Sequence, residues 1–118
     1  MALTRDFKET VMELCKDQQY RVAILIEALE SYLEGDIVVG NSLFRDYLNG
    51  TKNFGKVASM MQMQEAGLRR MLSPKGNGTA KNMFRLFKTC LELEGMSSLE
   101  FLQSSVANDE TFTVTTAV

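Results

Sequence analysis

Only one proline, Pro74, interrupts the 118 residues of this chain, and the apolar residues around it recur at helical spacing. One stretch follows the i, i+3, i+4, i+7 pattern of a helix with one buried face: Val22, Leu25, Ile26 and Leu29. Eight methionines and seven phenylalanines supply the bulk for a core, and a chain of this length suits one compact domain. The sequence therefore predicts an all-α fold.

Capping residues and glycines mark where the first helices begin and end. Thr4 is the predicted N-cap of a helix over residues 5–16, and Gly35 stands where the C-cap of the second helix belongs. Asp36 is the predicted N-cap of a third helix, which Gly50 ends. The apolar residues of this third helix are Ile37, Val39, Leu43, Phe44, Tyr47 and Leu48. We interpret these helices as scaffold, as a dimer surface, or as both.

The second half of the chain contains a loop and two further helix starts. Residues 73–78 combine a proline with two glycines and are predicted to be a loop. Thr79 is the predicted N-cap of a longer helix that ends at Gly95, and Ser97 and Glu100 have the spacing of a capping box for a last short helix. The apolar stripe of the longer helix is Met83, Phe84, Phe87, Cys90 and Leu91.

Two shorter helices are predicted before the loop, over residues 53–61 and 64–72. Two short helices joined by a tight turn form a helix-turn-helix motif. The motif requires a small residue where the helices approach, an apolar residue that fills the turn, and an apolar anchor on the second helix. Ala58, Met63 and Leu68 have the spacing for these three places.

The second short helix has an outer face that is rich in polar side chains. Arginine and glutamine are well suited to bidentate contacts with guanine and adenine in the major groove. The predicted base-reading residues are Gln64, Glu65, Ala66, Arg69 and Arg70. Flanking lysines, and the loop that leads into the next helix N-terminus, are predicted to contact phosphates. These predicted phosphate contacts are Lys52, Lys56, Lys75, Asn77, Thr79 and Lys81.

Charge is distributed in three blocks, although the formal net charge is only −2. Residues 51–90 hold eight basic side chains and Glu65 as their single acid, a balance of +7. Residues 1–50 have a balance of −4, and residues 91–118 a balance of −5. A basic centre between acidic ends is typical of a surface that binds a polyanion. The alternative is that these charges disperse over solvated helix faces.

The chain has no histidine, which excludes a Ser-His-Asp or Cys-His nucleophile pair and any metal site that needs an imidazole. Cys15 and Cys90 are too few for a structural zinc site and are predicted to be reduced, buried thiols. We therefore expect no enzymatic activity, no metal and no cofactor.

No segment approaches the roughly 18 consecutive apolar residues of a membrane span, and the charged N-terminal residues do not fit a signal peptide. A cytoplasmic protein without membrane contact is expected.

Three runs around the predicted turn are distinctive: Phe54-Gly-Lys-Val-Ala58, Leu68-Arg-Arg-Met-Leu72 and Pro74-Lys-Gly-Asn-Gly-Thr-Ala-Lys-Asn-Met-Phe84. They resemble the Cro/repressor-type helix-turn-helix family and, more narrowly, its addiction-module antidote (antitoxin) branch. That branch has a Gly-Asn-Pro-Thr-like loop, where this chain has Gly-Asn-Gly-Thr. The resemblance covers about residues 1–95. It implies a five-helix DNA-binding domain of a transcriptional regulator or antitoxin, often with a small toxin as partner.

The predicted organisation is a helix-turn-helix DNA-binding domain over residues 1–96, with its motif at about residues 53–72, and a C-terminal extension over residues 97–118. The extension ends in an alternating, β-rich stretch over residues 111–118, which predicts either a short strand or a mobile tail. We also expect a dimer contact there. The apolar residues expected at this contact are Phe101, Leu102, Phe112 and Val114.

The predicted function is sequence-specific DNA binding by a transcriptional regulator of the antitoxin type, which reads the major groove of double-stranded DNA as a homodimer. The alternative is a protein-interaction module that neutralises a small toxin and binds DNA weakly or not at all. The two hypotheses differ in what they require of residues 64–70, because reading DNA requires that this face is not buried.

Overall fold

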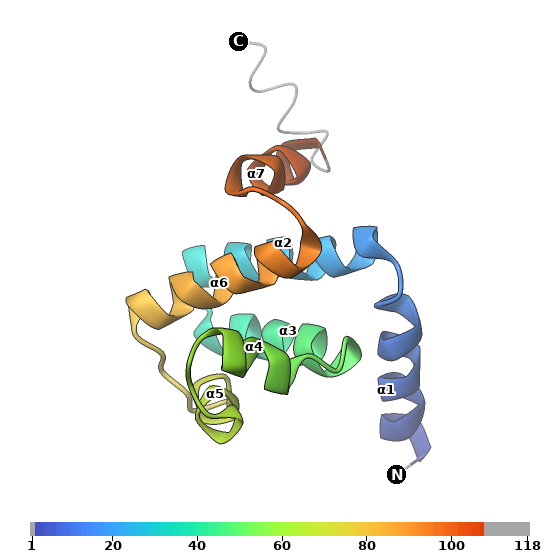
Figure 1. Cartoon of the computed structure of the whole chain (residues 1–118). Coiled ribbons are helices and arrows are strands. Elements are labelled where there is room, and N and C mark those ends of the chain that lie inside the picture. Colours follow the sequence, from blue (N-terminus) through green and yellow to red (C-terminus); the bar gives the residue numbers. More distant parts are fainter. Residues whose placement is uncertain (1, 108–118) are drawn as a thin grey trace.

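Seven helices joined by short turns make up residues 2–107, the part of the chain that the computed structural model describes (Figure 1). Their bounds are α1 Ala2–Leu14, α2 Gln18–Leu33, α3 Ile37–Gly50, α4 Phe54–Met60, α5 Glu65–Met71, α6 Ala80–Glu94 and α7 Ser98–Ala107. These residues contain no strand, and the predicted all-α fold is confirmed for them. The predicted strand or tail over residues 111–118, with Phe112 and Val114, lies outside the described residues.

The helices are arranged around an antiparallel pair that α2 and α3 form (Figure 1). α6 packs against α2 and α4, whereas α1 contacts α3 and stands at one edge of the molecule (Figure 1). α5 and α7 lie at opposite ends (Figure 1). In the described part of the chain, no helix has both the length and the apolar character that crossing a bilayer requires.

Aromatic rings at the centre of the molecule join α2, α3 and α6. The Phe44 and Phe87 rings lie 4.8 Å apart between centroids at an angle of 74°, and Phe87 also makes an edge contact with Tyr32 at 6.2 Å. Such edge-to-face pairs stabilise a core beyond the area that they bury. Phe101 of α7 is buried, with its ring 6.5 Å from that of Phe87. The expectation that Phe101 is exposed at a dimer contact is therefore wrong, because this side chain anchors α7 to its own core.

Several helix ends have the caps that the sequence predicts. The side chains of Asp36 and Thr79 each accept a hydrogen bond from the backbone N–H three residues further on, at 3.2 Å. Ser97 and Glu100 exchange the two hydrogen bonds of a capping box, at 2.9 and 3.1 Å. The bond from the Ser97 backbone N–H also lowers the pKa of the Glu100 carboxyl. Gly95 ends α6 in the left-handed conformation, with φ of 69°.

Other expectations about helix ends and faces are wrong. α1 begins before Thr4, so this residue lies inside the helix and is not its N-cap. Phe84 is 71 % exposed, although it lies on nearly the same face of α6 as the buried Leu91 two turns later. Ile37 and Val39 in the first turn of α3 are also exposed, whereas Phe44, Tyr47 and Leu48 in its later turns are buried.

Candidate nucleic-acid interface

The residues of α4 and α5, together with the turn between them, form what we name the α4–α5 unit (residues 54–71). Ala58 and Leu68, the predicted small residue and the predicted anchor, are both buried. Met63 in the turn packs partly buried against the core, and its N–H donates to the Ala58 carbonyl at 3.0 Å. The three residues therefore pack toward the core, and the helix-turn-helix motif stays a prediction.

The turn of the α4–α5 unit contains a side-chain-bearing residue in the left-handed region. Gln62 has φ of 57°, a conformation that costs a non-glycine residue about 1 kcal/mol. Hydrogen bonds hold the backbone on both sides of it: the Met61 N–H donates to the Val57 carbonyl at 2.9 Å, and the Met63 N–H donates to the Ala58 carbonyl at 3.0 Å. The turn therefore keeps its shape with glutamine at a position that favours glycine.

The outer face of the α4–α5 unit is free of burial. Leu68 and Met71 point into the core, and all the predicted base-reading residues are exposed: Gln64, Glu65, Ala66, Arg69 and Arg70. Gln64 lies just outside α5, as its N-cap residue in extended conformation, and its side chain makes no capping hydrogen bond. Arg70 has no hydrogen-bond or ion-pair partner for its side chain among residues 7–106. The structure therefore brings these five side chains together at one exposed surface.

Arg69 differs from its neighbours because its side chain is held in place. Its Nε donates to Glu65 Oε2 at 2.9 Å, one helical turn earlier. Its guanidinium carbon lies 4.0 Å from the centre of the Phe54 ring, at the start of α4. Arg69 therefore links neighbouring turns of α5 through an exposed ion pair, and it joins α5 to α4 through a cation–π contact.

Two arginines from other helices hold the ends of α4 and α5. Arg85 of α6 donates to the Met61 carbonyl at 2.6 Å, and Arg45 of α3 donates to the Leu72 carbonyl. These carbonyls follow the last turns of α4 and α5, where the helix itself supplies no donor. A guanidinium donor there satisfies the carbonyl and fixes the helix end. Arg85 belongs to the basic block of the sequence, but its side chain serves the fold.

Asn41 of α3 fixes the loop that follows α5. It is buried, and its Nδ2 donates to the carbonyls of Ser73 and Gly76 at 3.2 and 3.3 Å. Its Oδ1 accepts from the Tyr32 hydroxyl at 2.7 Å. This role of Asn41 was not predicted from the sequence. Its signal was a polar side chain on an apolar stripe, since positions 41, 44 and 48 share one face of α3.

Gly76 in this loop packs directly against the end of α5. A Cβ at this position would lie 2.1 Å from the Met71 carbonyl oxygen and 2.5 Å from that of Arg70. No side chain fits there without moving the backbone. The glycine therefore has a packing role that its place in a predicted phosphate loop did not reveal.

The loop and the start of α6 carry four of the predicted phosphate contacts. Lys75, Asn77 and Lys81 are exposed, and their side chains have no partner within residues 7–106. The Thr79 hydroxyl oxygen is used as the cap of α6, where it accepts from the Asn82 N–H. Because Gly76 and Gly78 both pack against Met71 at the end of α5, Lys75, Asn77 and Thr79 lie beside that end of the α4–α5 unit.

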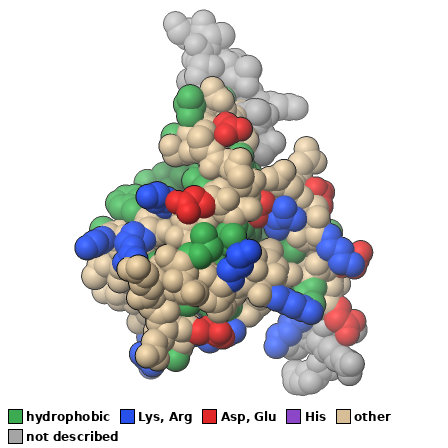
Figure 2. All heavy atoms as spheres, viewed as in Figure 1, with side chains coloured by type: hydrophobic (Ala, Val, Ile, Leu, Met, Phe, Trp, Pro, Cys, Tyr) green, Lys and Arg blue, Asp and Glu red, His purple; other side chains and the backbone are tan. Residues whose placement is uncertain are grey.

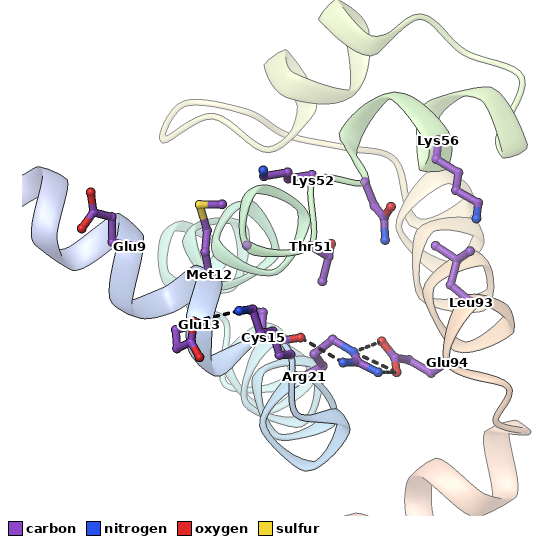
Figure 3. A pocket seen from close by; sticks show the side chains of 13 residues that line it. Glu9, Met12, Glu13, Cys15, Arg21, Thr51, Lys52, Lys56, Leu93 and Glu94 are labelled. Carbon is purple, nitrogen blue, oxygen red and sulfur yellow. Dashed lines mark hydrogen bonds and ion pairs between the residues drawn. The ribbon is translucent and has the colours of Figure 1, made fainter.

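Lys52 and Lys56 belong to a different part of the surface. They border a pocket of about 600 Å³, which α1, α2, α6 and the turn between α3 and α4 also line and to which α5 contributes no residue. Figure 3 shows the Lys52 side chain directed toward α1 and the Lys56 side chain beside α6. Glu9 and Glu13 line the same pocket. The structure does not bring these two lysines together with the exposed side chains of α5.

Basic side chains do not form one continuous patch on the face drawn in Figure 2. Lys and Arg side chains are spread over most of its width, with Asp and Glu side chains among them (Figure 2). One of the eight basic residues of the 51–90 block, Arg85, is bound to a backbone carbonyl. The positive balance of residues 51–90 is therefore divided between the fold and several parts of the surface.

The two cysteines are buried, as the sequence predicts. Burial raises the pKa of the Cys15 thiol and of the Cys90 thiol above the ordinary value, so the reactive thiolate is disfavoured at both. In the described residues, no three histidine, cysteine, aspartate or glutamate side chains lie together in a way that could hold a metal ion.

Comparison of this chain with protein-family models, with curated proteins and with solved structures found no match. The resemblance to the Cro/repressor-type family therefore stays a prediction. The case for a function depends on the geometry of the α4–α5 unit.

Proposed function

We propose that this protein is a cytoplasmic, sequence-specific transcriptional regulator of the helix-turn-helix, antitoxin-like type, which inserts α5 into the major groove of double-stranded DNA. The observation that supports this most is the division of α5 into two faces. Leu68 and Met71 are buried, whereas the five side chains at its start and on its other face are exposed. A helix that reads base edges needs this combination, because one of its faces must pack against the domain and the other must be exposed to the groove.

The way in which the α4–α5 unit is held also supports the proposal. Arg85, Arg45 and Asn41 bind the carbonyls that follow α4 and α5. A recognition element that is already ordered loses less conformational entropy when it binds.

We propose that the active form is a homodimer. α5 has only seven residues, so one copy reads few base pairs, and two half-sites one helical turn apart multiply the specificity. Sedimentation of the full chain, with and without DNA, tests this part. A monomer at high micromolar concentration under both conditions would contradict it.

The salt dependence of binding tests the proposed function. Affinity for duplex DNA is expected to fall as salt rises, with a slope of about −0.9 for each neutralised phosphate. Lys75→Ala or Lys81→Ala should lower this slope by about one unit and weaken binding to all duplexes alike. Lys16→Ala is the matched control, since Lys16 is an exposed lysine of another surface that pairs with Glu13. Absence of binding to every duplex at low salt would refute the proposal.

A second candidate function is neutralisation of a small toxin protein. The observation that favours it is an exposed apolar stripe on α7, at the end of the molecule opposite to α5 (Figure 1): Leu99, Leu102 and Val106. Their i, i+3, i+7 spacing places them on one helix face, as in helices that dock into an apolar groove. Co-purification with the product of the adjacent gene, and its loss in Leu102→Lys, would support this function.

A further inference from the structure

Glu65 is an exposed residue at the start of α5, but its carboxylate is directed toward the protein. Its Oε2 accepts from Arg69 Nε at 2.9 Å. Its Oε1 lies 3.0 Å from the place that a Cβ on Gly55 of α4 would occupy. Both oxygens are therefore turned back along the α4–α5 unit, which does not fit the predicted role of Glu65 as a base reader.

The Arg69 guanidinium is fixed in two directions by these contacts. The ion pair with Glu65 holds one edge, and the Phe54 ring, 4.0 Å below the guanidinium carbon, holds one face. Phe54 is itself buried, with 3 % of its surface exposed, so it is a rigid support. An arginine on an exposed helix usually samples many rotamers, and these contacts restrict them.

The donors that remain free on Arg69 define what it can bind. Nε is occupied, whereas Nη1 and Nη2 have no partner among the described residues, and the side chain is half-exposed. Two parallel N–H donors match the O6 and N7 acceptors of guanine in the major groove. Adenine presents an N6 donor beside N7 and would leave one of these N–H groups facing another donor.

We infer that Glu65 and Phe54 are positioning residues that hold Arg69 ready for a guanine in the major groove, and that Arg69 makes this protein prefer a G·C pair at one position of its site. The inference rests on the proposed DNA-binding function. It changes the role of Glu65 from a side chain that reads a base to one that orients the side chain that does.

The experiment measures base preference separately from affinity. Duplexes selected from a random pool by the full chain define the preferred site, and competition with duplexes in which single G·C pairs are replaced by A·T gives the guanine preference at each position. The proteins compared are the natural chain, Arg69→Lys, Glu65→Gln and the double variant. Glu13→Gln is the matched control, because it removes the same kind of exposed ion pair, with Lys16 at 2.9 Å, from α1.

Arg69→Lys is expected to reduce the guanine preference at one position roughly 5- to 150-fold, because lysine has no planar pair of donors. Glu65→Gln should reduce it about two- to fivefold at the same position, with no further loss when Arg69 is already lysine. Glu13→Gln should leave it unchanged. Thermal unfolding of Glu65→Gln and Glu13→Gln should shift by similar small amounts, so that a loss of preference is not a loss of fold.

Several other results would contradict the inference, and each would do so for a different reason. If Glu65→Gln strengthens binding to all duplexes alike and leaves the guanine preference intact, Glu65 acts only as a negative charge and the inference is overturned. The same holds if Arg69→Lys changes no base preference, or if Glu65→Gln has its full effect in the Arg69→Lys background. A natural chain that binds no duplex would instead refute the proposed function, and with it the inference.

Discussion

Two arginine–glutamate pairs in this protein have the same length and opposite surroundings. The distance from Nε to Oε2 is 2.9 Å both for Arg21–Glu94 and for Arg69–Glu65. The Glu94 side chain is 4 % exposed, whereas the Glu65 side chain is 48 % exposed. Solvent screens the exposed pair and leaves it little net energy, whereas a buried carboxylate depends on its partners.

The buried pair is part of a network that joins three helices, and Figure 3 shows the contacts between Arg21 and Glu94 within it. Arg21 of α2 binds both carboxylate oxygens of Glu94 on α6, and the Tyr47 hydroxyl of α3 donates to Glu94 Oε2 at 2.7 Å. The hydrogen bond to Glu94 raises the pKa of Arg21. The exposed pair joins only neighbouring turns of α5. Because the two distances are equal, burial decides the role of each pair. The buried pair fixes helices to one another, whereas the exposed pair leaves its side chains able to bind other partners.

The largest expected effect comes from breaking the buried pair. Glu94→Gln leaves the Arg21 guanidinium without its counter-ion, so we expect a loss of about 3 kcal/mol in the free energy of unfolding. Urea denaturation followed by circular dichroism measures it, and Glu65→Gln is the matched control on the exposed pair. Equal losses in the two variants would contradict the comparison.

Tyr47→Phe measures how much of the free energy of unfolding depends on the hydrogen bond that the Glu94 carboxylate accepts from Tyr47. It removes the donor at 2.7 Å from Glu94 and keeps the buried ring. We expect a loss of about 2 kcal/mol, since a hydrogen bond to a charged group is removed. The same urea titration tests this. A change within error would mean that the ion pair alone satisfies Glu94.

Arg69→Ala should have the smallest effect on stability. It removes an exposed ion pair and the contact with Phe54, and we expect a loss of about 1 kcal/mol. This exceeds the roughly 0.5 kcal/mol of an ordinary exposed substitution, because the side chain also bridges α4 and α5. Thermal unfolding of Arg69→Ala beside Arg70→Ala, which loses no such contacts, measures the difference. A loss above that of Glu94→Gln would invert the comparison.

The features that the sequence predicted correctly are local ones. Asp36 and Thr79 cap helices through a backbone N–H only three residues away, and Ser97 does so with Glu100. Leu68 is buried because it lies at helical spacing from the next apolar residues of α5 and therefore shares their face. Such features need no knowledge of what lies across the fold.

The features that the sequence did not predict depend on distant partners. Arg85 contacts a carbonyl 24 residues away, and Asn41 contacts two that are 32 and 35 residues away. Neither partner is a side chain, so no charge pattern or motif reveals it. Lys52 and Lys56 belong to the same basic block of the sequence as the exposed arginines of α5. In the structure they lie at a pocket that α1 and α6 help to line.

The sequence by itself determined that the chain is helical, where most helices begin and end, and which side chains of α5 are polar, because each depends on periods and caps a few residues long. Only the tertiary structure decided which apolar residues are covered and which charges are bound within the fold. Phe101 is buried and Phe84 is exposed, Glu94 is enclosed and Glu65 is solvated, although their side chains are chemically alike. The reason is physical: burial and hydrogen bonding depend on what neighbouring helices place around a side chain, and residues far apart in the chain supply those neighbours.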